Sequence, residues 1–199
     1  MRTFIFKPEI QKMKAHNLFT LCLFTFAMHS NAKAQTKPLS ANEIVNTAQK
    51  EAAKSNKNIL IIFHASWCVW CHKMDAALND EKVKKFFDNN YVIKHLTVDE
   101  SKDKKELENP GANELRTKYH GDNQGIPYWF ILDKNGKLLA DSRMINDAGK
   151  TGNNVGCPSD PEEVDYFVNV IAKTSRLTNN QLNLIKERFL KNKETAIKN

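Results

Sequence analysis

The sequence predicts an α/β sandwich built on a mixed β-sheet. Segments with helical periodicity alternate with short apolar runs that are typical of strands. Helical crossovers between the first strands imply parallel pairing, whereas an Asn-Gly turn at 135–136 implies an antiparallel pair. With 199 residues, 41% hydrophobic and 27% charged, the chain has the size and composition of one globular domain with an appendage.

The first predicted helix and strand follow residue 40. The sequence "SANE" at 40–43 has the spacing of a capping box, so a helix is expected over about 41–55. The run "NILIIFHA" at 58–65 is continuously apolar, as expected for a central strand covered on both faces. This strand delivers a close pair of cysteines, Cys68 and Cys71, at its carboxyl end.

The middle of the chain continues the alternation. A helix is expected over 72–78, and a second one begins at 79–81, where acidic side chains favour the positive end of a helix dipole. The run "YVIKHLTV" at 91–98 predicts the next strand. A polar stretch over 99–109 then precedes a short helix around 113–119.

The last part of the domain is expected to hold a hairpin and two helices. Strands at 128–132 and 137–140 flank the Asn-Gly turn, which is a strong hairpin signal. Residues 145–156 are rich in Gly and Asn without periodicity and predict a loop. Pro161 suits the first turn of the next helix, and "TNNQ" opens a last helix over 178–194.

The first 34 residues have the pattern of a secretory signal peptide. Basic residues precede an apolar run at 18–28, and Ala32 and Ala34 offer a cleavage site. The apolar run has 11 residues, fewer than the roughly 20 that span a bilayer as a helix. We therefore predict a signal peptide over 1–34, membrane contact only during export, and a periplasmic or secreted protein after cleavage near Ala34.

The net charge of the mature chain does not indicate a nucleic-acid partner. The signal peptide carries five basic residues and one acidic residue, so its removal lowers the net charge from +7 to +3. Lysine-rich patches remain at 81–85 and 101–106, but acidic residues interleave with them and no aromatic pattern accompanies them. Solvated helix faces are therefore expected there, and no nucleic acid is expected to bind.

Export leaves three cysteines, Cys68, Cys71 and Cys157, which cannot form a densely bridged disulfide scaffold. A chemically active role therefore explains the close pair better than a purely structural disulfide. Cys68 would lie at a helix amino terminus, where free amides and the helix dipole stabilise a thiolate. Cys71 lies one turn further on, close enough to form a disulfide. Cys68 would then attack a disulfide, and Cys71 would resolve the mixed disulfide.

Two segments make the chain resemble the thioredoxin-like proteins. "WCVWC" after "ILIIFHAS" is similar to the thioredoxin pattern of apolar strand, Trp, Cys-x-x-Cys and helix. "GIPYWFILDKNGKLL" at 125–139 is similar to the second hallmark, an Ile-Pro whose peptide bond is cis in that family, followed by a hairpin. The segment 70–100 further resembles the secreted bacterial branch. The resemblance, over roughly 40–174, implies a three-layer sandwich with a mixed central sheet.

The same resemblance implies a domain division and an activity. The thioredoxin-like domain would cover 35–174, and a C-terminal helical extension would cover 175–199. The chain would be an exported thiol-disulfide oxidoreductase, a disulfide reductase whose redox pair is Cys68 and Cys71, with no other cofactor and no metal. Its partners would be protein disulfides or dithiols and a thiol electron donor.

The resemblance also assigns residues to a substrate site. Pro127 would face the disulfide, and the backbone of Ile126 would bind an incoming substrate strand. Trp67 would line the substrate groove. Trp70 would either line the same groove or pack beneath the loop.

The chain departs from the family at one position that matters for proton transfer. Thioredoxins carry a buried acid six residues before the first cysteine, and Ile62 stands there in this chain. His64 and His72 could handle the proton instead, because histidine has an unperturbed pKa near 6.5. Alternatively, His64 packs at the end of the strand and His72 is exposed.

The third cysteine and the overall function leave alternatives open. Cys157 falls in a loop beside the groove, where we expect an unpaired, semi-buried thiol. The alternative makes it a third redox thiol or a soft metal ligand. A copper-binding module could use Cys68, Cys71 and either Cys157 or a histidine. A non-catalytic thioredoxin-like interaction domain is the third possibility, and the intact cysteine pair argues against it.

Overall fold

The structure, a computed structural model, describes residues 37–145 and 149–194. The predicted signal peptide lies outside the described residues. The helices are α2 (Ala41–Ser55), α3 (Val69–Leu78), α4 (Lys84–Asn90), the 3-10 helix η2 (Lys102–Leu107), α5 (Ala112–Lys118), α6 (Pro161–Thr174) and α7 (Asn179–Glu194). Within these ranges, no helix combines the length and the apolar character needed to cross a membrane.

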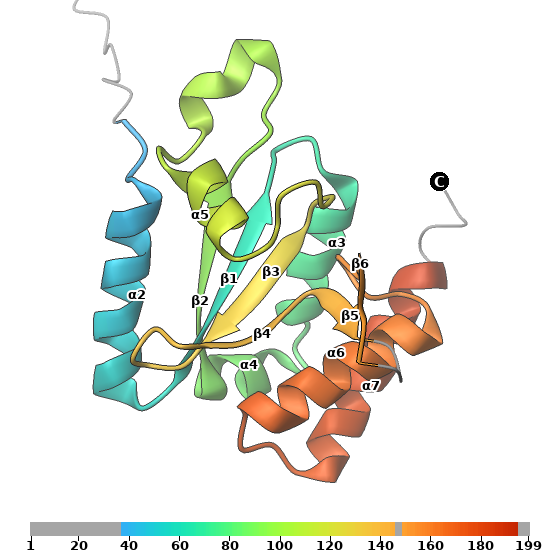
Figure 1. Ribbon diagram of the computed structural model, residues 1–199. Helices are drawn as coiled ribbons and strands as arrows, with labels where there is room; N and C mark the ends of the chain where they lie inside the picture. Colours follow the sequence, from blue (N-terminus) through green and yellow to red (C-terminus); the bar gives the residue numbers. More distant parts are fainter. Residues whose placement is uncertain (1–36, 146–148, 195–199) are drawn as a thin grey trace, which may run out of the picture. The chain divides into compact units, whose positions relative to one another are not determined.

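The strands form a mixed four-stranded sheet and a separate two-stranded one. They are β1 (Asn58–His64), β2 (Tyr91–Thr97), β3 (Tyr128–Leu132), β4 (Leu138–Asp141), β5 (Arg143–Ile145) and β6 (Thr151–Asn154). The larger sheet has the order β2-β1-β3-β4 (Figure 1). β1 is parallel to β2 and antiparallel to β3, and β3 is antiparallel to β4. The predicted parallel pair and the predicted hairpin are both confirmed.

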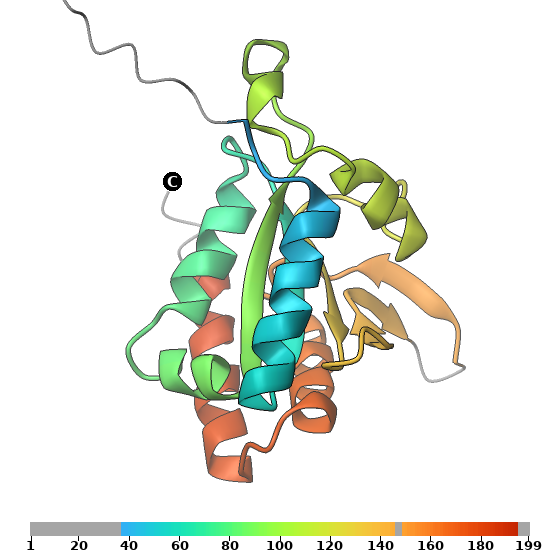
Figure 2. The same ribbon diagram turned by 90° about the vertical axis from the view of Figure 1, so that its left-hand side faces the viewer.

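Helices cover both faces of the larger sheet. Side chains alternate along β1, so this strand contributes to two separate hydrophobic cores. Leu60 and Ile62 belong to the core shared with α3, α4, α6 and α7. Ile59, Ile61 and Phe63 belong to the core shared with α2 and α5. Figure 2 shows α3, α4 and α7 on one side of β2 and α2 with α5 on the other, which confirms the three-layer sandwich.

Local chemistry explains where the helices begin. The capping box of α2 is present, because Ser40 Oγ accepts a hydrogen bond from Glu43 N and Glu43 Oε2 accepts one from Ser40 N. α6 begins at Pro161, as predicted. The helix after the cysteines begins at Val69 rather than at residue 72, because Cys68 itself is its N-cap residue. α4 begins at Lys84, after a turn, and therefore later than predicted.

The predicted loop at 145–156 is wrong at 151–154, which form β6, and its residues 146–148 lie outside the described residues. β5 and β6 pair antiparallel in this region and form a hairpin. These strands have only three and four residues, and none of their side chains is buried. Apolar alternation therefore does not mark them in the sequence, since only the half-buried Met144 of these strands packs against a core.

The C-terminal helix α7 packs on the core that contains α6. Ile185 and Phe189 on this helix are fully buried. The Phe189 ring lies 4.7 Å from the Phe167 ring and 6.3 Å from the Phe87 ring, measured between centroids. The predicted C-terminal helix is therefore present. The division into a domain at 35–174 and an extension at 175–199 stays a prediction.

Candidate active site

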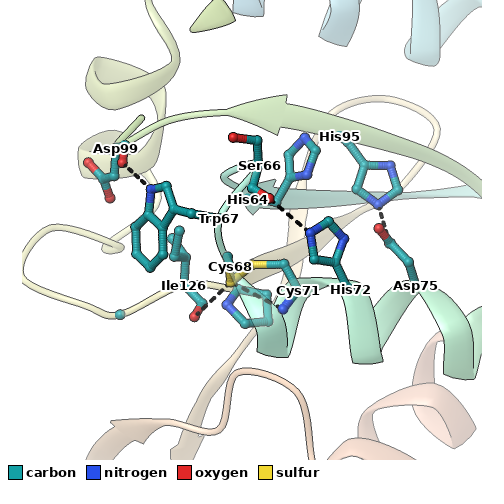
Figure 3. Close-up of a disulfide and its surroundings, with 12 residues drawn as sticks. His64, Ser66, Trp67, Cys68, Cys71, His72, Asp75, His95, Asp99 and Ile126 are labelled. Carbon is teal, nitrogen blue, oxygen red and sulfur yellow. Dashed lines mark hydrogen bonds and ion pairs between the residues drawn. A yellow bond between two sulfur atoms is a disulfide. The ribbon is translucent and has the colours of Figure 1, made fainter. Parts of the chain in front are cut away.

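The predicted redox pair forms a disulfide between the end of β1 and the first turn of α3. Cys68 and Cys71 are joined at the amino terminus of this helix (Figure 3). Cys68 Sγ accepts a hydrogen bond from the backbone N of Cys71 at 3.1 Å. The exposed fraction is 3% for Cys68 and 1% for Cys71. The helix terminus therefore contacts the sulfur that is expected to attack, and both cysteines are buried.

The proline loop lies across from the disulfide. The Ile126-Pro127 peptide bond is cis, as the resemblance implied. The carbonyl oxygen of Ile126 lies 3.7 Å from Cys68 Sγ (Figure 3), and the half-buried Ile126 side chain packs against both cysteines. Two segments that are distant in sequence thus meet at the sulfur pair.

Exposed apolar side chains border the disulfide. The exposed fractions are 57% for Trp67, 61% for Val69 and 40% for Trp70. The Trp67 indole is held in place because its Nε1 donates to the carbonyl of Asp99 at 2.8 Å. The Trp70 ring lies 4.4 Å from Lys73 Nζ, so it stands at the surface and does not pack beneath the loop.

A groove begins beside the disulfide. It has a volume of about 510 Å³ and runs from Trp70 past Ile126 and Pro127 to the segment 153–157. Asn154 Nδ2 donates to the carbonyl of Gly125 at 2.7 Å and to that of Pro127 at 3.1 Å. The β5-β6 hairpin, which sequence reasoning missed, therefore fixes one wall of this groove against the proline loop.

Comparison with known proteins agrees with this arrangement. Residues 41–134 match a family model described as thioredoxin-like. The chain carries a thioredoxin-like domain. Among curated proteins, no sequence matches this chain.

Solved structures with some likeness to the thioredoxin-like chain are distant. A disulphide isomerase from Xylella fastidiosa Temecula1 is 22% identical over 51% of this chain and 72% of that chain, with a TM-score of 0.42. A DsbH oxidoreductase is 21% identical over 69% and 83%, with a TM-score of 0.41. The oxidised C-terminal domain of Neisseria meningitidis DsbD is 20% identical over 58% and 87%, with a TM-score of 0.37. The assignment therefore rests on the family model and on the cysteine pair.

Histidines gather on the α3 side of the thioredoxin-like domain. His64 lies on the same face of β1 as Ile62, and its ring centroid is 5.2 Å from that of His95. His95 Nε2 donates to Asp75 Oδ1 at 2.7 Å (Figure 3). Burial, followed by the charge of His95, lowers the pKa of His64. A neutral imidazole is thus favoured near the position where thioredoxins carry an acid.

His64 was predicted from the sequence as an accessory residue, whereas His95 and Asp75 were not. The register of β2 against β1 places His95 opposite Ile62, and Asp75 lies one helical turn after Cys71. No local pattern in the sequence gives that register. His72, the other predicted accessory residue, is exposed and donates from Nε2 to the carbonyl of Ser66 at 2.9 Å.

A second polar group, also missed in the sequence, holds the turn before Cys68. Glu100 is 4% exposed, and its carboxylate accepts hydrogen bonds from Ser66 N at 2.6 Å and Ser66 Oγ at 2.8 Å. The neighbouring Asp99 has a left-handed backbone, with φ at 53°, and its carboxylate pairs with Arg116 at 2.6 Å. Both residues lie in the stretch predicted to be polar, where only the fold reveals that Glu100 is buried.

The environment of Cys157 favours the unpaired, buried thiol. Its exposed fraction is 5%, and it forms no disulfide. Burial raises the pKa of the Cys157 thiol to about 12, and Asn192 Nδ2 lies 3.3 Å from its sulfur. A thiol in this environment carries little thiolate at neutral pH and is a poor nucleophile.

The described ranges give no support to the copper-binding alternative. Within residues 37–145 and 149–194, no group of three or more His, Cys, Asp or Glu side chains could hold a metal ion. The two cysteines that this alternative requires are joined to each other.

Proposed function

We propose that this chain is an exported thiol-disulfide oxidoreductase that reduces disulfides in protein substrates. The observation that carries the proposal is the Cys68–Cys71 disulfide at the amino terminus of α3, opposite the carbonyl of Ile126. Export is supported by the signal-peptide pattern of residues 1–34.

The reaction begins from the reduced pair. Because Cys68 lies at the helix terminus and accepts the amide of Cys71, its thiolate is the favoured nucleophile. The thiolate attacks one sulfur of a substrate disulfide. The substrate S–S bond breaks, a mixed disulfide forms with Cys68, and the first substrate thiolate leaves and takes up a proton from water.

The second step releases the substrate. Cys71 loses its proton, and its thiolate attacks the Cys68 sulfur of the mixed disulfide. The Cys68–Cys71 bond forms, and the second substrate thiolate leaves and takes up a proton. Two electrons and two protons have then passed from the cysteine pair to the substrate. A donor dithiol, itself oxidised to a disulfide, regenerates the reduced pair.

The surface around the pair suits an extended segment of a substrate protein. Trp67, Val69 and Trp70 present apolar area beside the sulfurs, and the backbone of Ile126 faces Cys68. A substrate strand that lies along Ile126 brings its own disulfide to Cys68. The Trp67 and Trp70 side chains then shield the reacting sulfurs from water.

Reduction of insulin by dithiothreitol tests the proposal. Wild-type protein should accelerate insulin precipitation, and Cys68→Ser should abolish the acceleration. Cys157→Ser should retain it, since that thiol lies outside the exchange. Activity in the Cys68→Ser variant would contradict the assignment of the attacking sulfur.

The direction of exchange is tested by the equilibrium with glutathione. We expect the potential of the pair to lie closer to the roughly −270 mV of thioredoxin than to the roughly −120 mV of DsbA. This expectation follows from the thioredoxin-like Ile before Pro127. A potential near the DsbA value would point to an oxidase instead.

The proposed export is tested by the mass of the protein isolated from cells. Cleavage after Ala34 gives a mature chain that begins at Gln35 in the periplasmic or secreted fraction. A full-length chain in the cytoplasm would contradict the proposed location.

A further inference from the structure

Glu100 has an environment that the proposed exchange reaction does not by itself explain. Among residues 37–145 and 149–194, it is the one buried residue whose side chain carries a formal charge. In that part of the chain, no ion pair involves its carboxylate. A buried charge without a partner of opposite sign is costly and calls for a compensating role.

Both carboxylate oxygens of Glu100 point to the turn that presents Cys68. Oε1 accepts the backbone N–H of Ser66, and Oε2 accepts its hydroxyl. Ser66 is the second residue before Cys68. A hydrogen bond from Cys68 N to the carbonyl of Ala65, at 3.1 Å, closes the turn. Glu100 therefore holds this turn through two hydrogen bonds.

Further hydrogen bonds hold together the Ser66–Cys68 turn and the segment after β2 that contains Glu100. His72 donates to the carbonyl of Ser66, and Trp67 donates to the carbonyl of Asp99 (Figure 3). Glu100 N donates to Glu108 Oε1 at 2.8 Å. The active-site turn and the segment after β2 thus form one hydrogen-bonded unit.

We propose that Glu100 is a positioning residue of the redox centre, which fixes the Ser66–Cys68 turn and whose negative charge opposes formation of the Cys68 thiolate. The inference rests on the proposed function. Glu100 supplies a buried acid from the segment after β2, whereas the family's acid position on β1 holds Ile62.

The direction of the charge effect follows from electrostatics. A carboxylate near a thiol disfavours the thiolate, and burial reduces the screening by water. The amino terminus of α3 acts in the opposite sense, because it stabilises the thiolate. A less stable thiolate makes the reduced pair a better electron donor, which suits a reductase.

The variant Glu100→Gln tests the charge, because it keeps the shape and an acceptor for Ser66. In reduced protein, the thiolate absorbance of Cys68 should titrate about one pH unit lower than in wild type. The equilibrium with glutathione should shift at least threefold toward the reduced pair. The other titratable groups near the pair, His64, His72, His95 and Asp75, are unchanged in this variant.

Two matched variants separate charge from position. Glu106→Gln removes an exposed carboxylate of η2 and should leave both the Cys68 titration and the glutathione equilibrium unchanged. Ser66→Ala keeps the charge of Glu100 but removes one of its hydrogen bonds. It should slow insulin reduction at least threefold without lowering the pH at which Cys68 titrates.

The inference is overturned if Glu100→Gln matches Glu106→Gln in both measurements. Should Glu100→Gln fail to fold, the carboxyl ¹³C resonance of Glu100 in the wild-type protein tests the proposed charge effect instead. It should shift as Cys68 titrates in the reduced form and not in the oxidised form, and a constant resonance overturns the proposal. A wild-type protein that titrates as expected but does not reduce insulin would contradict the proposed function alone.

Discussion

Two cysteines in this chain show how the surroundings of a thiol decide its chemistry. Cys68 caps α3 and accepts a backbone amide, whereas Cys157 is buried against Asn192 with its pKa raised to about 12. Their exposed fractions are nearly the same, 3% and 5%. The helix terminus beside Cys68 therefore makes the difference, since burial alone disfavours a thiolate.

Cys157 should resist alkylation in the native protein. With the Cys68–Cys71 pair oxidised, iodoacetamide at pH 8 should label Cys157 at least a hundredfold more slowly than in urea, because its thiol is buried and protonated. Peptide mass spectrometry measures the rate. Rapid labelling of Cys157 in the native protein, or a disulfide to Cys157 after mild oxidation, would support the alternative that Cys157 is a third redox thiol.

His64 should make folding stability depend on pH. Burial lowers its pKa in the folded protein from the ordinary 6.5, so the unfolded chain binds this proton more readily as the pH falls. Stability should therefore decrease below about pH 6.5, until the lowered pKa of the folded state is passed. Urea midpoints from pH 7 to 5 measure this slope. It should be shallower in His64→Gln, and an identical slope in both proteins would contradict this account.

Among the elements, those marked by local chemistry could be predicted from the sequence and those fixed by tertiary contacts could not. The capping box at 40–43 and Pro161 give two helix starts directly. The strand at 58–64 is recognisable because both its faces are buried. The β5-β6 hairpin has no such signal, because its side chains contribute little to either core.

α7 should behave as part of the core. Phe189→Ala removes a ring that packs against Phe87 and Phe167 and should lower the free energy of unfolding by about 3–5 kcal/mol. Leu184→Ala, at a half-exposed position on the same helix, should cost less than about 0.5 kcal/mol. Urea denaturation measures both. Equal, small effects would show that α7 is an appendage, as the predicted boundary at 175 implies.

At the scale of the whole molecule, the fold brings together three segments that are separate in sequence. β1 and α3 supply the cysteines, the segment after β2 supplies Glu100, and the loop before β3 supplies Ile126. The cysteines and the proline could be predicted, because short sequence hallmarks mark both. Glu100, His95 and Asp75 could not, because their places depend on strand register and on burial.

The most direct test of the account traps the intermediate of exchange. Cys71→Ser, incubated with a disulfide-containing protein, should form a mixed disulfide on Cys68 that dithiothreitol releases and that peptide mass spectrometry locates. The matched variant Cys68→Ser should form none. An adduct on Cys71 in Cys68→Ser of equal yield, or no adduct in Cys71→Ser, would contradict the claim that Cys68 is the attacking sulfur of a thiol-disulfide oxidoreductase.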